Sequence, residues 1–373
     1  MASTVRDWLT RRWFSVQQQS PALAFMTGLG ADFLTLGRID EPRNLLLQSM
    51  YLSIGALVLV FSTAQKSEWV HTGMHARRLV ARGLVRYGGF VFHFAMGALL
   101  SAFTFFYFKS ASGAGPTIFL LGLATALILN ELPWFQKLGV SIRSVFFQLA
   151  LVSFATFVIP MMVGRLHGGL FVLAVFLSAS ATLLMALCMQ ILGVALESIR
   201  QQFLKPCASV LTGFCVLYLF DFIPPIPLSV QYVGAFHSVE RVGSTYHLAT
   251  DEEPWYQAHL LDPVIHLRPR ERVYIFVRIF APRDFSEKVF LRWEWDNPES
   301  GWVETDRIRL PIRGGRGRGF RGYTYKANHQ PGLWQVFIES SDGRGIGHYR
   351  FEIRPEPSNK GATRTYPLVQ SRQ

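Results

Sequence analysis

Long stretches of apolar residues dominate the first 228 positions of the chain, and short runs of alternating character follow them. A helix needs about 20 mostly apolar residues to cross a bilayer, because every backbone amide must be paired internally where water is absent. Six stretches meet this requirement: 45–64, 88–108, 114–132, 145–163, 170–194 and 206–223. A seventh, 21–36, is shorter and contains Asp32, so it is either a short span or a re-entrant segment. We expect it to span, which predicts an α-helical polytopic membrane region of seven helices, or six if this segment does not cross.

The C-terminal part of the chain carries the pattern of β-strands. Runs rich in β-branched and aromatic residues lie at 273–280, 289–295, 302–310, 319–327, 333–340 and 348–353. The glycine-containing turn at 341–345 predicts that the last two runs form a hairpin. Short strands without helical periodicity are typical of an all-β domain, and their number favours an antiparallel β-sandwich of immunoglobulin-like type.

These patterns predict five segments. The prolines at 224–227 cannot continue the last helix and favour an extended exit from the membrane. Arg11 and Arg12 resemble a twin-arginine export signal, but no small-residue cleavage site follows them cleanly. The segments are 1–20, a cytoplasmic amphipathic segment; 21–223, the transmembrane helical domain; 224–271, a proline-rich exit and extracytoplasmic linker; 272–355, the β-sandwich domain; and 356–373, a flexible tail.

Charged residues divide the chain in the same way. Residues 1–228 contain 16 Lys and Arg and 8 Asp and Glu, whereas the remaining 145 residues contain 21 and 17. All three cysteines lie in the first part, so the C-terminal domain has neither a disulfide nor a cysteine-based zinc site. This distribution excludes a single soluble enzyme, a disordered chain and a nucleic-acid-binding domain defined by its basic charge.

The basic residues of the membrane region also predict its orientation. Four of them, Arg38, Arg43, Lys109 and Arg165, fall on one side of a seven-span topology. Twelve fall on the other side: Arg6, Arg11, Arg12, Lys66, Arg77, Arg78, Arg82, Arg86, Lys137, Arg143, Arg200 and Lys205. Cytoplasmic loops carry the excess of Lys and Arg, so we expect a cytoplasmic N-terminus and an extracytoplasmic C-terminal domain. With six spans, nine basic residues fall on the cytoplasmic side and seven on the other, and the C-terminal domain is still extracytoplasmic.

Several motifs along the chain resemble those of one bacterial family. They are Asp32-Phe33-Leu34-Thr35-Leu36-Gly37-Arg38-Ile39-Asp40, Asn130-Glu131, Ile223-Pro224-Pro225-Ile226-Pro227-Leu228-Ser229, His237-Ser238-Val239-Glu240-Arg241, Leu291-Arg292-Trp293 and Gly332-Leu333-Trp334-Gln335-Val336. The chain resembles multi-pass inner-membrane proteins whose C-terminal part is the domain of unknown function 2914. The resemblance implies a membrane region in the bacterial inner membrane and a small periplasmic β domain. It supplies no activity and no catalytic residues.

Charged residues at the membrane boundary are the first candidate site. The predicted topology places Asp32, Arg38, Asp40 and Asp221 towards the extracytoplasmic side, where they would line one cavity as a proton or ligand site. The alternative is an interfacial cluster of ion pairs that holds helices together, which we favour because interfacial charges cost less than central ones.

A second candidate is a basic stripe in the loop before the span at 88–108. Arg78, Arg82 and Arg86 recur every four residues, which predicts a surface helix that contacts anionic lipid headgroups. The alternative is that these arginines only determine the topology. His93 and the pair Asn130 and Glu131 are either a relay or groups satisfied by neighbouring helices.

The third candidate is a ligand or partner surface on the β domain, formed by Trp293, Arg316, Arg318 and Arg321. The arginine–glycine tract resembles an RNA-binding segment, but the predicted compartment holds little RNA, so a basic loop between strands is the default and an anionic lipid or polysaccharide is the alternative as a partner. Strand tryptophans stack sugars or, more often, pack in a core. The histidines His237, His247, His259 and His266 match no metal-ligand spacing, so we predict neither a metal nor another cofactor.

The motifs of common enzymes are missing from the sequence: there is no phosphate-binding glycine loop, metalloprotease motif, nucleophile elbow or dinucleotide fingerprint. We therefore predict a non-enzymatic anchor or accessory subunit whose β-sandwich binds a protein partner or envelope polymer. Its partners would be the lipid bilayer and a membrane protein or a second copy of the chain. The alternative is a transporter or membrane-embedded enzyme that uses the charged cluster.

Overall fold

The computed structural model describes residues 41–64, 75–111, 114–136, 138–243, 245–249, 262–282, 285–313, 319–356 and 368–371, with the backbone alone for 75–86. The chain divides into two compact units. The helical unit consists of Met1–Phe108, Ile118–Val158 and Phe171–Phe220, and the β unit consists of Lys109–Thr117, Ile159–Leu170 and Asp221–Gln373. The β unit thus includes two helix-end segments besides the C-terminal part of the chain.

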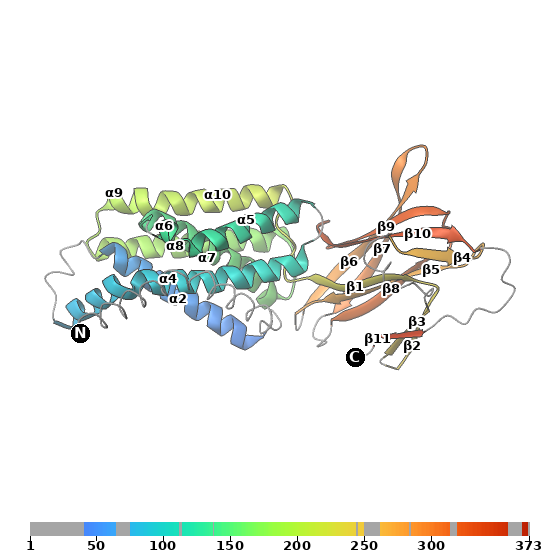
Figure 1. The fold of residues 1–373 in the computed structure, drawn as a ribbon, viewed down its shortest axis with the longest axis horizontal. Coiled ribbons are helices and arrows are strands. Elements are labelled where there is room, and N and C mark those ends of the chain that lie inside the picture. Colours follow the sequence, from blue (N-terminus) through green and yellow to red (C-terminus); the bar gives the residue numbers. More distant parts are fainter. Residues whose placement is uncertain are drawn as a thin grey trace, which may run out of the picture. The chain divides into compact units, whose positions relative to one another are not determined.

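The described part of the helical region contains one helix for each of the six later predicted spans (Figure 1). Five helical segments, Pro42–Ala64, Tyr87–Ser110, Val140–Val163, Gly168–Ile191 and Leu196–Leu219, are long and apolar enough to cross a membrane, and Gly115–Glu131 is a shorter apolar helix. The predicted first span, 21–36, lies outside the described residues, so the count of seven stays a prediction. The elements are α2 (Pro42–Ala64), α4 (His75–Ser110), α5 (Ala114–Glu131), α6 (Pro133–Gln136), α7 (Val140–Val163), α8 (Gly168–Ile191), α9 (Leu196–Ile199), the π-helix η1 (Arg200–Leu204) and α10 (Lys205–Leu219).

Helix α4 joins two elements that the sequence predicted separately. The surface helix expected at 78–86 and the span expected at 88–108 form one continuous helix, His75–Ser110. No proline interrupts this segment, and most residues between 75 and 87 favour a helix. The basic stripe and the membrane span are therefore parts of one rigid element.

The last helix begins earlier than the predicted start at residue 206. Helical structure runs from Leu196 through η1 into α10, with Pro206 in the first turn of α10. Pro206 has no N–H to donate to the carbonyl of Gln202, and a wider π-turn directly precedes it. The hydroxyl of Ser144 on α7 donates to the Gln202 carbonyl at 3.2 Å. A neighbouring helix thus satisfies this carbonyl, and the chain stays helical where the sequence predicted a break.

Hydrogen bonds between helices satisfy several of the buried polar side chains. The His93 Nδ1 of α4 lies 2.9 Å from the Asn130 Oδ1 of α5, and the Asn130 amide donates to the His93 carbonyl at 2.9 Å. Tyr107 and Thr156 form a buried pair at 2.9 Å between their hydroxyl oxygens. For His93 and Asn130 the structure therefore supports the alternative of mutual satisfaction by neighbouring helices.

The β unit contains eleven described strands in three sheets (Figure 1). One sheet has the order β1-β5-β8, the second β4-β10-β9-β6-β7, and the third β11-β3-β2. All pairings are antiparallel except that of β4 with β10. The strands are β1 (Ser229–Phe236), β2 (Ser238–Val242), β3 (Thr245–Ala249), β4 (Val264–Leu267), β5 (Val273–Phe280), β6 (Ser286–Asn297), β7 (Gly301–Arg313), β8 (Phe320–Lys326), β9 (Gly332–Glu339), β10 (Gly345–Pro355) and β11 (Leu368–Ser371).

Strands β5 to β10 correspond to the six predicted runs, and the predicted hairpin is the antiparallel pair β9–β10. Four further strands, β1 to β4, lie in 224–271, which the sequence assigned to a linker, and β11 lies in the predicted tail. Strand β1 pairs with β5 along its length, and β4 adds a parallel edge to β10. Strands β1, β4 and β11 pair with strands distant in the chain, whereas β2 and β3 form a local hairpin.

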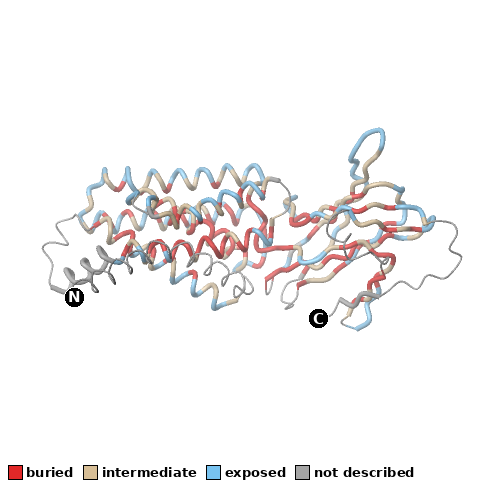
Figure 2. The backbone as a smooth tube through the Cα atoms, in the orientation of Figure 1, coloured by how far each residue is buried: buried red, intermediate tan, exposed pale blue. Residues whose placement is uncertain are grey.

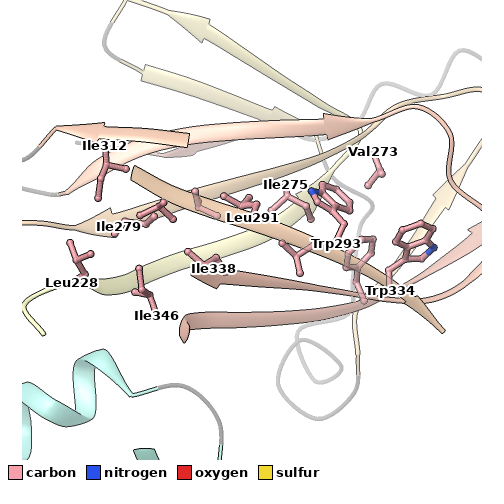
Figure 3. Close-up of a cluster of buried hydrophobic side chains, with 14 of the residues drawn as sticks. Leu228, Val273, Ile275, Ile279, Leu291, Trp293, Ile312, Trp334, Ile338 and Ile346 are labelled. Atoms are coloured by element: carbon pink, nitrogen blue, oxygen red, sulfur yellow. The ribbon is translucent and has the colours of Figure 1, made fainter. Parts of the chain in front are cut away.

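The core of the β unit lies between the three-stranded sheet β1-β5-β8 and the five-stranded sheet. Val273, Ile275 and Ile279 of β5 are fully buried, as are Leu291 and Trp293 of β6 (Figure 3). These residues occupy alternate positions along their strands, as expected when one face of a strand meets the core. Figure 2 shows the buried positions in red, whereas the tip of the β6–β7 hairpin, 298–305, is exposed. The immunoglobulin-like type of this two-sheet unit stays a prediction.

We expect Asn130→Ala to destabilise the helical unit by about 1–3 kcal/mol, because it removes both hydrogen bonds to His93 and leaves a buried ring nitrogen without this partner. Thermal unfolding of the full chain in a mild detergent measures the effect. Thr125→Ala on the same helix is the matched control, since the exposed Thr125 hydroxyl bonds only to the carbonyl of Leu121 one turn earlier. Equal melting temperatures for Asn130→Ala and the wild type would contradict the expectation.

Candidate functional site

The outer face of the sheet β1-β5-β8 presents tyrosine and arginine side chains. Along β8, Arg321, Tyr323 and Tyr325 alternate with buried Gly322, Thr324 and Lys326. Strand alternation places the first three on the same face of the sheet, away from the core. Tyr323 and Tyr325 keep 39% and 49% of their surface exposed, which is unusual for rings on a strand.

The register of the strands brings residues from three segments together on this face. Tyr274 of β5 lies opposite Tyr325, and Arg278 lies between Arg321 of β8 and Tyr232 of β1. The ring centroid of Tyr274 is 5.7 Å from that of Tyr325 and 6.1 Å from that of Tyr323. The guanidinium of Arg272 lies 4.7 Å from the centroid of the Tyr325 ring.

The hairpin of β2 and β3 covers one part of the same face. Phe236, Val239, Tyr246, Leu248 and Phe276 form a second buried cluster there, separate from the core between the sheets. The ring of Tyr246 has two guanidinium groups near it, that of Arg321 at 5.4 Å and that of Arg241 at 6.0 Å. We call this surface the tyrosine–arginine face, consisting of Tyr232, Tyr246, Tyr274, Tyr323, Tyr325, Arg241, Arg272, Arg278 and Arg321.

The guanidinium groups of this face lack carboxylate partners. In the part of the chain that the structure describes, Arg241, Arg272, Arg278 and Arg321 form no ion pair, and the Nε of Arg278 is buried without a hydrogen bond. Three of these guanidinium groups, those of Arg241, Arg272 and Arg321, lie near tyrosine rings, and Arg241 also donates to the carbonyl of Gly243 at 3.1 Å. Four cations without described carboxylate partners create a positive potential.

The outer face of the five-stranded sheet differs, because most of its described arginines are paired, although the exposed Arg309 of β7 forms no ion pair among the described residues. The Nε of Arg292 and an Nη of Arg307 contact the carboxylate of Glu339 at 2.8 Å and 3.2 Å. Arg350 pairs with Asp262 at 3.1 Å. The two outer faces of the β unit therefore differ in degree of compensation: most described arginines of one are paired with carboxylates, and none of the four on the other is.

The hydroxyl of Tyr232 stays protonated on the tyrosine–arginine face at neutral pH. Burial raises the pKa of Tyr232, and the neighbouring Arg278 guanidinium opposes that rise without cancelling it. A protonated phenol both donates and accepts hydrogen bonds, whereas the guanidinium groups beside it only donate them. The face thus offers aromatic rings, hydroxyl groups and cations within one surface.

A buried histidine and a carboxylate support the strands beneath this face. His237, directly after β1, has its Nδ1 2.9 Å from the Oε1 of Glu271, which precedes β5. The amide of Arg268 donates to the Oε2 of Glu271 at 2.8 Å. Burial raises the pKa of Glu271, but the hydrogen bonds from His237 and the Arg268 amide outweigh that effect and hold it below its ordinary value of 4.5.

The predicted site residues have different outcomes. Asp32, Arg38, Asp40, Arg316 and Arg318 lie outside the described residues. Asp221 is described, and its carboxylate lies 3.7 Å from the Nε of Arg344 within the β unit. The positions of Arg78, Arg82 and Arg86 lie on helix α4, whose backbone alone is described there. Arg321 belongs to the tyrosine–arginine face.

Trp293 as part of a ligand surface was a wrong prediction. Its side chain is fully buried between the sheets, where it packs edge-on against Trp334 and Phe351 with ring centroids 6.4 Å and 6.3 Å away (Figure 3). Its position in β6 points inward because it alternates with the outward Arg292.

Metal ligands do not gather in the described part of the chain, where no three His, Cys, Asp or Glu side chains form a candidate metal site. His237 bonds to Glu271, and His247 lies in β3 opposite Glu240 of β2. His259 lies outside the described residues.

The sequence analysis missed the tyrosines of the candidate face. The alternation of Arg321, Tyr323 and Tyr325 carries a signal, because residues two apart in a strand share a face. The sequence gives no sign that Tyr232 and Tyr274 lie on the same face as these residues, because no local pattern predicts that β1, β5 and β8 pair with one another.

The fold and the site define a membrane-associated protein with a C-terminal β unit that carries a cationic aromatic surface. Residues 286–353, from the start of β6 into β10, match the family model described as Protein of unknown function (DUF2914). This match confirms the resemblance predicted for the C-terminal region, and the apolar helices suggest its multi-pass membrane part.

No curated protein matches the chain. Among solved structures, a β-glucosidase from Listeria innocua in complex with glucose matches with 12% identity and a TM-score of 0.19, over 34% of this chain and 16% of that one. An immunoglobulin-like protein from Pseudomonas aeruginosa matches with 10% identity and a TM-score of 0.18, over 31% and 97%. An alkylpurine DNA glycosylase from Pseudomonas fluorescens, bound to DNA containing an abasic site analog, matches with 13% identity and a TM-score of 0.22, over 83% and 99%. Scores this low do not establish a shared fold.

We expect Glu271→Gln to lower the stability of the folded chain by about 1–2 kcal/mol at neutral pH, since it weakens hydrogen bonds to a charged group. A carboxyl whose folded pKa is depressed stabilises the fold above its unfolded pKa of 4.5, and this contribution is lost as the pH falls through the lower folded value. The wild type should therefore lose more stability than Glu271→Gln between about pH 6 and pH 3.

Chemical denaturation followed by tryptophan fluorescence measures both effects. Glu299→Gln in the exposed β6–β7 hairpin is the control and should show the pH dependence of the wild type. Parallel pH profiles for the wild type and Glu271→Gln would argue against the role of this carboxylate.

Proposed function

We propose that the protein is a non-enzymatic component of the bacterial inner membrane whose β unit lies in the periplasm. Its helices anchor the chain in the bilayer, and its tyrosine–arginine face binds an anionic polysaccharide of the cell envelope. The observation that carries the proposal is the difference between the two outer faces of the β unit: none of the four arginines of the tyrosine–arginine face pairs with a described carboxylate, whereas most described arginines of the other face do, Arg309 being an exception.

The orientation follows from the distribution of basic residues along the chain. Twelve Lys and Arg fall on the predicted cytoplasmic side and four on the other, outside the C-terminal part. This bias is the signal by which membrane proteins are oriented, and it favours a periplasmic β unit. A surface in that compartment faces the polymers of the envelope.

The chemistry of the face fits a polymer of acidic sugars. Guanidinium groups form charge-assisted, often bidentate hydrogen bonds with carboxylates and phosphates. Exposed tyrosine rings such as Tyr323 and Tyr325 provide flat apolar surface with a hydroxyl at one end, which suits the alternating C–H and O–H groups of a sugar. A neutral glycan would leave the four cations of the face uncompensated.

The rival function, a transporter or membrane-embedded enzyme, has less support. It depends on a cluster of Asp32, Arg38, Asp40 and Asp221, of which only Asp221 is described. The carboxylate of Asp221 is 73% exposed and already lies near Arg344. This pair joins the segment after α10 to the turn between β9 and β10 and holds no two helices together, so both readings of the cluster stay predictions.

The proposal predicts that the full chain, purified in mild detergent, binds polygalacturonate and does not bind the neutral polymer dextran. Arg321→Gln should weaken binding about tenfold, because a lost charge-assisted hydrogen bond is worth about 1.5–3 kcal/mol. Binding should also weaken when the salt concentration rises, since the contacts are solvent-exposed charges. Microscale thermophoresis at two salt concentrations measures these effects.

Arg307→Gln on the opposite sheet is the matched control, since Glu339 keeps its contact with Arg292 when Arg307 is removed. It should bind within about twofold of the wild type. Equal affinity of Arg321→Gln, Tyr325→Ala and the wild type would overturn the assignment of the face, and equal binding of dextran would overturn the class of ligand.

A further inference from the structure

Helix α4 presents a face of small and polar residues inside its membrane-crossing segment. Gly89, His93 and Gly97 follow one another at intervals of four, so they lie on one side of the helix. Side chains from two other helices fill the space above the glycines. A Cβ on Gly97 would lie 3.0 Å from the Oε1 of Glu131, and a Cβ on Gly89 would lie 3.2 Å from an Nη of Arg143.

The position of Arg143 relative to the bilayer can be read from the two helices it joins. Arg143 lies three residues after the start of α7, and Gly89 lies two residues after the start of the apolar segment Tyr87–Ser110 of α4. Both are thus in the first turn of a membrane-crossing segment, which is the depth of the lipid headgroups. This conclusion holds whichever side of the membrane the segment begins on.

The guanidinium of Arg143 has no counter-charge among the described residues. It forms no ion pair there, and its Nε is buried without a hydrogen bond. The carboxylate near this helix face, that of Glu131, lies beside Gly97, which is about 12 Å further along α4 than Gly89. Glu131 instead accepts a hydrogen bond from the Asn130 amide at 3.3 Å.

The same side of α4 continues outward into the basic stripe. The positions of Arg78, Arg82 and Arg86 precede Gly89 at intervals of four, four and three residues on one unbroken helix, so they follow the same face. A group held between Gly89 and Arg143 would therefore lie at the membrane end of a row of basic positions.

We propose that Arg143, whose guanidinium lies against α4 at Gly89, binds the phosphate of one anionic phospholipid, with the positions of Arg78, Arg82 and Arg86 extending the site towards water. The guanidinium matches a phosphate in charge and in bidentate geometry. Gly89 supplies the close approach, because any side chain there would crowd the guanidinium. Basic grooves between membrane helices at headgroup depth are suited to anionic lipids.

Native mass spectrometry of the full chain in detergent, titrated with phosphatidylglycerol or phosphatidylcholine, tests the site. Phosphatidylglycerol should bind about tenfold more tightly than phosphatidylcholine, and Arg143→Gln should remove that preference. Gly89→Ala should weaken phosphatidylglycerol binding several-fold while the helix folds at least as well, because alanine favours a helix over glycine.

Two control variants separate this site from general effects on the helices. Gly122→Ala adds the same methyl group to α5 where nothing lies within 4 Å, and Arg200→Gln removes a guanidinium that lies 3.7 Å from Glu197. Both should bind phosphatidylglycerol within about twofold of the wild type. Unchanged binding by Arg143→Gln, or equal binding of both lipids, would overturn the proposal. Complete displacement of the lipid by inorganic phosphate would overturn it as well, since it would assign the site to free phosphate.

Discussion

The absence of water from the bilayer is the constraint on which the helical unit depends. Each backbone polar group among its helices must find its partner on the protein. Ser144 of α7 is an example: its hydroxyl donates a hydrogen bond to the carbonyl of Gln202, which Pro206 cannot do because proline has no N–H. The same requirement places Asn130 against His93. The hydrogen bonds that solve this problem also determine which helices lie beside one another.

The β unit solves a different problem, since water can satisfy its outer groups and its core needs only apolar side chains. This leaves the outer faces of the sheets free to carry charge in different ways. On the five-stranded sheet Glu339 compensates Arg292 and Arg307. On the tyrosine–arginine face Arg241, Arg272 and Arg321 lie near tyrosine rings and have no described carboxylate partner, and the proposed polysaccharide would supply the missing anions.

The sequence predicted what depends on local pattern. Six apolar stretches correspond to helices, and six β-rich runs correspond to strands β5 to β10, because periodicity and length are properties of a single segment. Interactions between distant segments escaped it. From the sequence alone, Pro206 indicates the start of a helix, because the hydrogen bond from Ser144 to the carbonyl of Gln202 cannot be foreseen. Likewise, the segment that forms β1 was predicted to be a linker, because its pairing with β5 cannot be foreseen.

The residues of the tyrosine–arginine face were equally difficult to predict from the sequence. Arg321 was found because a run of arginine and glycine is conspicuous, and Trp293 was chosen for its residue type although strand alternation turns it inward. The tyrosines belong to β1, β3, β5 and β8. The register of β1, β5 and β8 collects three strands' tyrosines, and the packing of the β2–β3 hairpin against Phe236 and Phe276 adds Tyr246. A binding surface on a sheet is built across strands, so its residues are spaced by pairing and not by sequence.

Unpaired guanidinium groups thus occur in both units, in two different solvents, and the solvent decides what each can bind. At the edge of the bilayer Arg143 can reach only what the membrane itself provides, and the phosphate of a lipid is the abundant anion at that depth. On the β unit the arginines face water, where a small anion would gain little over its hydration, so a ligand must make many contacts at once. A polymer with repeated charges meets that requirement, which is why an extended face with several cations favours it over a small molecule.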